Sequence, residues 1–507
     1  MTHAYGLWSL APAAAAIILA LATRNVVLSL FSATWLAGTL IVGGDPLAGL
    51  WKAVDPFMLD ALASRDHMKV TLFSLFVGAM VGVMTRAGGT RALVEWLVRL
   101  ASGRRGAMTA SWLAGMIVFF DDYANCLIVG NTMRPLCDRL RVSREKLSYI
   151  VDSTAAPVAS LALVSTWIGY EVGLMEEGLK AAGVEQDAYA FFIEGMGYRF
   201  YSIFTIVFVG AIAMLGRDFG PMLAAERRVA AAPEIEPDEG AHDAPPAARG
   251  LIAAAPVLTL VLVTFFVLWR DGRAAAPEAT RIFEILGAAN GYDAMLKSSL
   301  AGLICAGALA ALSRALSFGD IFEAGLKGAA LLFDALVVLF LAWSLGSGIN
   351  ALDAAGYLIG ALQSSLAPEL LPTLVFLLCA AISFATGTSF GTMAIVMPLV
   401  VPLSFAISDD PLIPLIASGA VLSGACWGDH CSPISDTTVL SSVGTRCDLM
   451  AHVRTQMPYA IVVGVISVVF GTLPAGYGVS PWLLLPLGAV ACAVTLRLFG
   501  KTAESSG

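Results

Sequence analysis

Charged residues are scarce in this chain of 507 residues. Lys, Arg, Asp and Glu together make up 13% of it, and 58% of the residues are hydrophobic. Because about a quarter of a soluble domain is charged, this composition excludes an ordinary soluble protein. About ten windows of roughly 20 apolar residues occur, each long enough to cross a bilayer. The composition therefore predicts an all-α polytopic membrane protein.

The chain also lacks cysteines at metal-binding spacing, a run of basic residues of the kind that binds nucleic acid, and a basic segment before its first apolar stretch. Its eight cysteines form no Cys-x-x-Cys pair and no zinc-type spacing; they stand at 126, 137, 305, 379, 426, 431, 447 and 492. We therefore expect buried thiols, no cofactor, and membrane lipid instead of nucleic acid as a partner. The first apolar stretch, Leu7–Ala22, has no basic leader, so we expect a first helix and not a cleaved signal.

Basic residues flank the segment 107–136 on both sides. Short loops rich in Lys and Arg face the cytoplasm, and this segment is too short for two crossings of about 20 residues each. The pattern predicts a re-entrant hairpin, residues 107–138, that opens to the cytoplasm and has its tip at 121–125. The flanking residues are Arg86, Arg91, Arg99, Arg104 and Arg105 before it and Arg134, Arg139, Arg141, Arg144 and Lys146 at its end and after it.

The second half carries a similar hairpin with acidic flanks. Residues 371–408 surround the polar stretch 386–392 and lie between Glu369 and Asp409, so this hairpin is expected to open outward. Each hairpin is followed by an expected broken helix, 147–174 and 411–442. An acidic outer loop is expected in the first half, with Glu171, Glu176, Glu177, Glu185, Asp187 and Glu194.

Two hairpins of opposite direction predict inverted-topology repeats, the organisation in which secondary transporters place their binding site at the repeat interface. Residues 156–165 align without gaps on residues 432–441, which supports the repeat. We expect N-terminal scaffold helices (1–66), a first repeat (67–218), a polar cytoplasmic linker (219–249), connecting helices (250–328), a second repeat (329–475), and a C-terminal helix and cytoplasmic tail (476–507).

Polar residues fall at membrane mid-depth in four clusters. An ionisable residue inside a membrane is expensive and therefore indicates function, and hard cations prefer oxygen ligands. The clusters predict an ion or substrate site made of Asp121, Asp122, Asn125, Asp152, Ser153, Thr154, Thr386, Thr388, Ser389, Asp429, Ser432, Asp436 and Thr437. Within it, we expect Na⁺ at Asp121, Asp152, Thr388, Ser389 and Asp429, and proton coupling at Asp122, Asp429 or Asp436, because Na⁺ and a proton compete for one carboxylate.

Structural interpretations remain open for the carboxylates. Asp121 or Asp122 is a candidate N-cap of the second helix of the first hairpin, since aspartate favours that position. Asp152 is a candidate partner of Lys146 or Arg144 at the membrane edge.

Other residues also have alternatives. Thr388 and Ser389 would satisfy backbone groups of an irregular turn, and His430 would be a hydrogen-bonding neighbour of Asp429. Residues 387–391 also match the Gly-x-Ser-x-Gly pattern of hydrolases, which requires a preceding strand and a nearby histidine. An apolar helical run precedes the motif, which disfavours a membrane hydrolase. An aspartyl protease lacks its accompanying motifs.

The motifs resemble those of the NhaC-type Na⁺/H⁺ antiporter family. The resemblance covers most of residues 70–475 and rests on FFDDYANC (119–126), VDSTAAP (151–157), ATGTSFGT (385–392) and GACWGDHCSPISDTT (424–438). It implies paired hairpins, broken helices and an elevator-type cycle. The family also includes exchangers of small organic anions, so the resemblance supports sodium coupling more firmly than proton exchange.

These observations lead to one main hypothesis and one alternative. The main hypothesis is a Na⁺/H⁺ antiporter of the cell inner or plasma membrane that works by alternating access. The alternative is a Na⁺-coupled transporter or exchanger of a small organic anion or amino acid, whose carboxylate would bind to hairpin amides and helix N-termini. By analogy with elevator-type transporters, we expect a homodimer.

Overall fold

The computed structural model describes residues 5–23, 25–163, 165–231, 247–278, 285, 288–362 and 366–503. The regular structure of these residues is helical, joined by turns and irregular segments, with one isolated backbone bridge between Asp218 and Lys501. In the described part of the chain, ten helices are long and apolar enough to cross a membrane, or up to twelve if each of two bent pairs is one span. The predicted all-α polytopic class is confirmed.

The helices long enough to span on their own include most of the bundle. They are α5 (Arg65–Arg86), α16 (Leu251–Ala275), α18 (Gly291–Leu312), α20 (Phe333–Ala351), α22 (Leu371–Thr386), α23 (Ser389–Ile407), α24 (Leu412–Cys431), α26 (Leu449–Ser467) and α28 (Pro481–Phe499), together with α1 (Ala11–Thr23) and the preceding turn η1 (Gly6–Leu10).

Shorter helices fill the connections and the interior. They are α2 (Val26–Ile41), α3 (Pro46–Lys52), α4 (Leu59–Ala63), α6 (Gly89–Leu100), α7 (Gly103–Ile117), α8 (Asp122–Ala124), α9 (Gly130–Arg139), α10 (Arg144–Ser153), α11 (Ala156–Ala159), α12 (Ile168–Ala182), α13 (Ala188–Glu194), α14 (Phe200–Leu215), α15 (Gly220–Ala231), α19 (Phe318–Ala330), α21 (Ala354–Leu362), α25 (Asp436–Thr445) and α27 (Leu473–Gly476). Single turns are η2 (Ala53–Met58), η3 (Asn125–Val129), η4 (Gly195–Tyr198), η5 (Ala247–Gly250), η6 (Pro368–Leu370) and η7 (Val468–Thr472).

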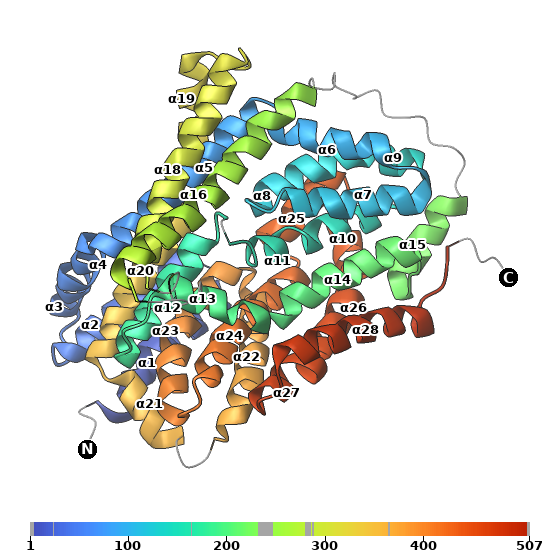
Figure 1. Ribbon diagram of the computed structural model, residues 1–507. Coiled ribbons are helices and arrows are strands. Elements are labelled where there is room, and N and C mark those ends of the chain that lie inside the picture. The colour runs from blue at the N-terminus through green and yellow to red at the C-terminus, as the bar shows by residue number, and fades with distance from the viewer. Residues whose placement is uncertain are drawn as a thin grey trace.

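One group of helices, α5, α16, α18 and α19, forms a wall along one side of the molecule (Figure 1). Glycines allow α5 and α19 to approach closely. A Cβ atom at Gly82 would lie 2.3 Å from the Ala324 carbonyl oxygen, and one at Gly328 would lie 2.2 Å from the Gly78 carbonyl oxygen. Close backbone approach through small residues is a common way of packing membrane helices, because lipid offers no hydrophobic drive for association.

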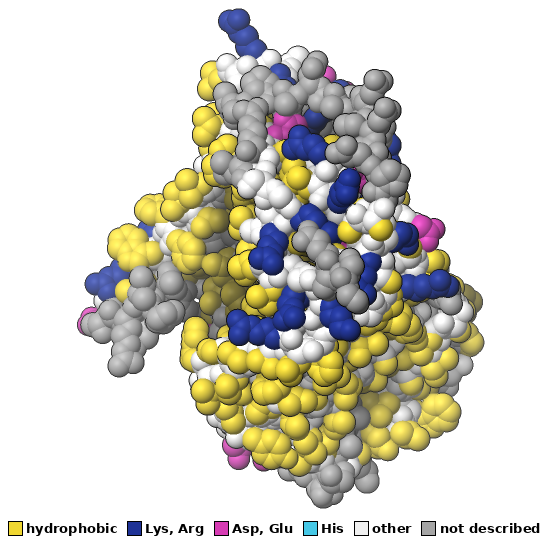
Figure 2. Space-filling view, turned by 90° about the vertical axis from the view of Figure 1, so that its right-hand side faces the viewer, with side chains coloured by type: hydrophobic (Ala, Val, Ile, Leu, Met, Phe, Trp, Pro, Cys, Tyr) yellow, Lys and Arg dark blue, Asp and Glu magenta, His cyan; other side chains and the backbone are white. Residues whose placement is uncertain are grey.

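The surface divides into a basic part and an apolar part. Figure 2 shows Lys and Arg side chains gathered on the upper part of one face, with hydrophobic side chains covering the part below. The basic part lies on the side of the molecule where α9, α15 and α28 end (Figure 1). An apolar belt bordered by a basic face is the distribution expected of a multi-pass membrane protein. That the basic side faces the cytoplasm stays a prediction.

Two pairs of contacting helices occupy the segments of the predicted hairpins, and their re-entrant character stays a prediction. In the first, α7 packs on α9, and the chain reverses at residues 118–121; in the second, α22 packs on α23, and the chain reverses at Gly387 and Thr388. The first hairpin lies in the upper part of Figure 1 and the second in the lower part. Each arm of the second hairpin is long enough by itself to span a membrane, whereas α7 and α9 are not.

The predicted acidic outer loop is wrong for its first half. Residues 168–182 form helix α12, and Glu171, Glu176 and Glu177 on it are 0%, 7% and 7% exposed. The structure stabilises two of these charges by pairing: Glu171 binds Arg199, and Glu176 binds Lys180. The same change shows that residues 147–174 are more than one broken helix, since they include α10, α11, an irregular stretch and the start of α12.

The predicted polar linker 219–249 is wrong for its first part, which is helical. Its first part is helix α15, which buries Met222, Ala225 and Glu226. Glu226 forms an ion pair with Arg104 and accepts a hydrogen bond from the Ser143 backbone nitrogen at 2.8 Å. These contacts explain the helix, because they link α15 to the first hairpin and to α10. Residues 232–246 lie outside the described residues.

Candidate functional site

Four interruptions of helical structure meet in the interior of the bundle. They are the two hairpin tips, the break between α10 and α11, and the break at residues 432–435 between α24 and α25. Direct contacts join them: the Asn125 side chain donates to the Thr154 carbonyl at 2.7 Å, and Tyr123 donates to the Asp436 carboxylate. A Cβ atom at Gly387 would lie 2.6 Å from the Ile434 side chain. Non-helical backbone at membrane depth is tolerated where protein or a cavity surrounds it.

The tip of the first hairpin is organised by Asp121 and Asn125. Asp121 is the N-cap of α8 and accepts a hydrogen bond from the Ala124 nitrogen at 2.6 Å. Its capping role, one of the two interpretations open from the sequence, is therefore present. The Asn125 amide also donates to the carbonyls of Gly115 at 2.8 Å and Val118 at 3.3 Å. Asn125 thus closes the turn and attaches it to the α10–α11 break.

Asp152 lies at the end of α10 and is held by residues from α25 and α26. Its Oδ2 atom accepts from Gln456 at 2.7 Å, Thr438 at 3.1 Å and His452, whose Nε2 atom is 3.2 Å away. The suggested pairing of Asp152 with Lys146 or Arg144 is wrong. Those two side chains pair with other carboxylates, Asp218 and Asp138 respectively, nearer the basic face.

Three more carboxylates belong to this cluster. Asp122 and Asp429 are buried, with 4% and 1% exposed, whereas Asp436 is exposed. Asp429 is within electrostatic range of Asp436, Asp152 and Asp122. None of the ion pairs formed between described residues involves Asp121, Asp122, Asp429 or Asp436. Several negative groups are therefore gathered without a basic partner.

Some buried acceptor oxygens at this place have no donor. The Oδ1 atoms of Asn125, Asp152 and Asp429 are buried and lack a hydrogen-bond partner within the described part of the chain. Leaving a buried polar atom unpaired costs about 1–3 kcal/mol. Oxygen atoms in this condition, next to uncompensated carboxylates, are suited to a hard cation.

His430 does not have the role expected for it. Its Nδ1 atom lies 2.8 Å from the Tyr201 hydroxyl, and its Nε2 atom lies 3.1 Å from the Ser153 hydroxyl and 4.0 Å from Asp152. The predicted hydrogen bond to neighbouring Asp429 is wrong, because successive residues of α24 point in different directions. His430 instead connects α24 with α10 and α14.

The second hairpin tip lies beside the α24–α25 break. Thr388 is the N-cap of α23 and accepts from the Gly391 nitrogen at 3.3 Å, while the Thr386 hydroxyl donates back to Ile382 at 2.9 Å. Ser389 is buried. Helix α22, not a strand, precedes Ser389, and His430 contacts other hydroxyls. The hydrolase pattern therefore lacks both of its required surroundings.

The remaining predicted residues make local contacts at the breaks. Thr154 donates to the Ile150 carbonyl at 2.8 Å, and Ser432 accepts from the Ile434 nitrogen at 3.4 Å. The Thr437 hydroxyl lies 3.2 Å from that of Ser435. Together with the contacts above, the structure gathers all four predicted clusters around one place.

Sequence reasoning missed two side chains from α26, His452 and Gln456. Both are buried, and both reach the same Asp152 oxygen. Their spacing of four residues places both side chains on one face of a helix, and this pattern in the sequence indicates that they can contact the same group. The basic residues Arg446 and Arg454 near them instead indicate the cytoplasmic end of the preceding apolar segment, residues 411–440.

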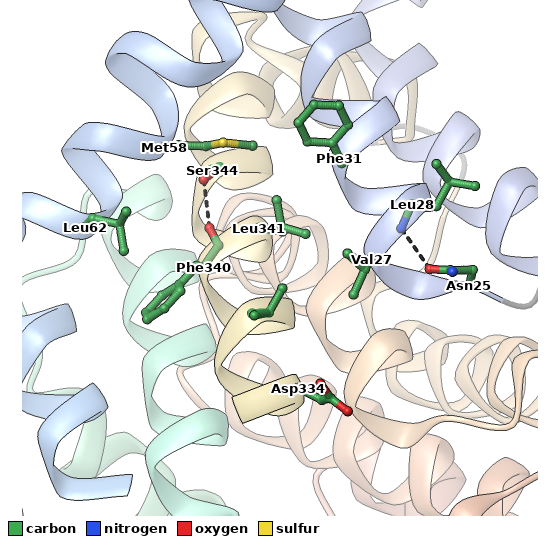
Figure 3. Close-up of a pocket in the computed structure, with 11 residues that line it drawn as sticks. Asn25, Val27, Leu28, Phe31, Met58, Leu62, Asp334, Phe340, Leu341 and Ser344 are labelled. Carbon is green, nitrogen blue, oxygen red and sulfur yellow. Dashed lines mark hydrogen bonds between the residues drawn. The ribbon is translucent and has the colours of Figure 1, made fainter. Parts of the chain in front are cut away.

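A separate pocket of about 810 Å³ lies between α2, α4 and α20 (Figure 3). Its walls are mostly apolar, with Asn25, Asp334 and Ser344 as polar members. Asn25 caps α2, and Ser344 donates to the Phe340 carbonyl at 2.7 Å. None of the predicted site residues lines this pocket. Despite its size, the pocket is therefore separate from the predicted ion site.

A membrane bundle whose broken helices and hairpin tips meet at a buried polar cluster has the architecture of a secondary transporter. The chain belongs to the Na⁺/H⁺ antiporter family, whose model matches residues 158–473. The matched region includes the second hairpin and the α24–α25 break, whereas Asp121, Asp122 and Asp152 precede it.

Individual relatives agree with this placement. An uncharacterized protein of Haemophilus influenzae is 32% identical over 97% of this chain and 95% of its own length. The malate-2H⁺/Na⁺-lactate antiporter of Bacillus subtilis is 46% identical over a short stretch, 12% of this chain and 13% of that protein. Among solved structures, the Alcanivorax borkumensis YdaH transporter, whose topology is described as unusual, has a TM-score of 0.58 at 16% identity and covers 90% of both chains. This last similarity concerns the fold alone.

Proposed function

We propose that this secondary transporter exchanges Na⁺ for protons across the membrane. The observation that carries the proposal is the group of buried carboxylates Asp122, Asp429 and Asp152, none of which pairs with a Lys or Arg among the described residues. Asp152 and Asp429 each also retain one acceptor oxygen without a hydrogen-bond partner in that part of the chain. Such a group requires a cation, either Na⁺ or a proton. Occupation by one excludes the other, which is the basis of obligatory exchange.

In this proposal, Na⁺ binds between the hairpin tips and the broken helices. Asp121 keeps one carboxylate oxygen on the α8 cap and presents the other, and Asp429, Thr388 and Ser389 add oxygens from the opposite side. Asp436 is the exposed carboxylate of the cluster and marks the side from which ions enter in this conformation. Alternating access would move the two hairpins against the wall formed by α5, α16, α18 and α19.

The test is Na⁺-driven proton movement in proteoliposomes that contain a pH-sensitive dye and no organic solute. We expect an outward Na⁺ gradient to acidify the lumen, and Asp429→Asn to reduce the rate at least about tenfold, because the variant loses the charge that Na⁺ and the proton share. Asp409→Asn, which changes an exposed loop carboxylate, is the matched control and should retain the rate. Wild-type protein that binds Na⁺ without moving protons would overturn proton exchange.

The similarity to the malate-2H⁺/Na⁺-lactate antiporter supports a second candidate, a Na⁺-coupled carrier of a small organic anion. The same vesicles loaded with radiolabelled malate or lactate distinguish the two functions. Solute movement that depends on Na⁺, with no proton flux in the absence of solute, would favour the organic carrier.

A further inference from the structure

The buried arginine at the start of α14, Arg199, uses only part of its guanidinium for hydrogen bonds to described residues. Arg199 directly precedes α14 and is 1% exposed, and its partner Glu171 on α12 is 0% exposed. The Arg199 Nη1 atom lies 3.0 Å from Glu171 Oε2. A charge pair this deep in a membrane protein is expensive and marks a functional position more often than a structural one.

Among the described residues, Arg199 makes its hydrogen bonds through one nitrogen, Nη1. Besides Glu171, Nη1 donates to the Ser160 carbonyl, and the Phe192 ring lies 4.0 Å from the guanidinium carbon, covering its face. The Nε and Nη2 atoms are buried and have no partner among the described residues. These two nitrogens share one edge of the guanidinium, and that edge is the fork that binds a carboxylate through two parallel hydrogen bonds.

The surroundings connect this edge with the ion cluster. Ser160 is the C-cap of α11, the short helix that follows the α10–α11 break. Two residues after Arg199, the Tyr201 hydroxyl reaches His430, the neighbour of Asp429. Helix α14 therefore carries Arg199 at its start and, two residues on, a side chain that contacts the helix bearing Asp429.

We propose that the Nε/Nη2 edge of Arg199 binds the carboxylate of a small organic anion. The proposal rests on the transporter function above and adds an anion to the cation exchange. Glu171 holds the guanidinium through Nη1 and leaves the fork open, while its negative charge limits the affinity for the anion. A purely structural Arg199, which only satisfies the Ser160 carbonyl and Glu171, predicts no anion binding.

The test measures thermal unfolding of the full-length protein in detergent. Sodium L-malate and sodium L-lactate are titrated against sodium chloride at equal Na⁺ concentration, since a ligand of the folded state at concentration c stabilises it by RT ln(1 + c/Kd) and so raises the Tm as its concentration increases. We expect at least one carboxylate to raise the Tm of the wild type beyond chloride. Glu171→Gln should lower the apparent Kd fitted to the Tm shifts about tenfold, because it removes a like charge close to the ligand.

Arg199→Lys keeps the charge but loses the fork, and it should abolish the carboxylate-specific shift. Lys327→Gln, which changes an exposed cation on α19, is the control and should behave as the wild type. If Arg199→Lys does not fold, Glu171→Gln decides alone.

Two results would overturn the anion site: no carboxylate shift in either the wild type or Glu171→Gln, or an undiminished shift in Arg199→Lys. Stabilisation by NaCl over choline chloride, measured in the same samples, reports the proposed Na⁺ cluster separately. Its loss with a retained carboxylate shift would count against the cation site and leave the Arg199 site standing.

Discussion

Asn125 is the residue that joins the first hairpin tip to the broken helix beside it. Its amide donates to three carbonyls, from α7, the turn and the α10–α11 break. Asn125→Ala would leave these buried acceptors without a donor, so we expect the free energy of unfolding to fall by about 1–3 kcal/mol or more. A lower Tm in detergent would show this change.

Asn131→Ala provides the control on the same hairpin. Asn131 is exposed, donates to the Leu127 carbonyl at 2.8 Å and accepts a long hydrogen bond from Arg134 Nη1 at 3.3 Å. Its substitution should change the Tm little, since surface changes usually remain within about 0.5 kcal/mol. Equal effects of the two substitutions would contradict the role given to Asn125.

The intramembrane carboxylates can be recognised from their residue type, but their binding partners cannot. The sequence identified Asp121, Asp152 and Asp429 as costly intramembrane carboxylates, because charge in an apolar segment needs a reason. It did not indicate that His452 and Gln456 would bind Asp152, since they are about 300 positions away in the chain. Only the packing of α26 against α10 decides that contact.

At the scale of elements, the contact between the first hairpin and α25 depends on two glycines. A Cβ atom at Gly444 would lie 2.4 Å from the Cys126 carbonyl oxygen, and one at Gly130 would lie 3.0 Å from the Gly444 carbonyl carbon. Gly444→Ala should force the hairpin away from α25 and separate Tyr123 from Asp436. We expect a severalfold loss of Na⁺-driven flux and about 1–3 kcal/mol of destabilisation from overpacking.

Gly307→Ala is the matched substitution on the membrane helix α18. The nearest atom to its added methyl group is the Ile321 Cγ2 atom at 3.6 Å, an ordinary contact. Flux and Tm should therefore remain near the wild type. A Gly444→Ala protein with unchanged flux would show that the hairpin does not need this close approach.

Some helix ends can be predicted from the residues at the end itself. Gly387 has a φ of +69° and ends α22, and Thr388 then caps α23, so the Thr-Gly-Thr-Ser stretch by itself indicates a helix–turn–helix. Helix α12 shows the opposite case. Its glutamates suggested a loop, and the cations that stabilise Glu171 and Glu176 include Arg199, which is 28 residues away from Glu171.

At the scale of the whole molecule, the two hairpins are expected to open on opposite sides of the membrane. Single cysteines at Arg105 and Arg139, both exposed at the base of the first hairpin, should react with an impermeant maleimide from the cytoplasmic side only. Cysteines at Ala367 and Asp409, exposed at the base of the second, should react from outside only. The assay uses intact cells and inverted vesicles of a variant in which the native cysteines are replaced.

Labelling of Arg105→Cys and Arg139→Cys from opposite sides would rule out the first re-entrant hairpin. Labelling of all four cysteines from one side would rule out the inverted repeat while leaving each hairpin intact. The basic face in Figure 2 favours the cytoplasmic assignment of the first hairpin.

Sequence patterns alone predicted the membrane class, which the apolar helices of the described chain confirm, and the positions of the two turns and of the carboxylates near them, whose ion-binding role stays a prediction. These features follow from composition, segment length and the cost of burying charge, which are properties of the chain before it folds. The tertiary structure decided the partners: Asp152 with α26, His430 with Ser153 and Tyr201, and Glu171 with Arg199. Those pairings join residues distant in the chain, and only close packing of several helices at once selects them.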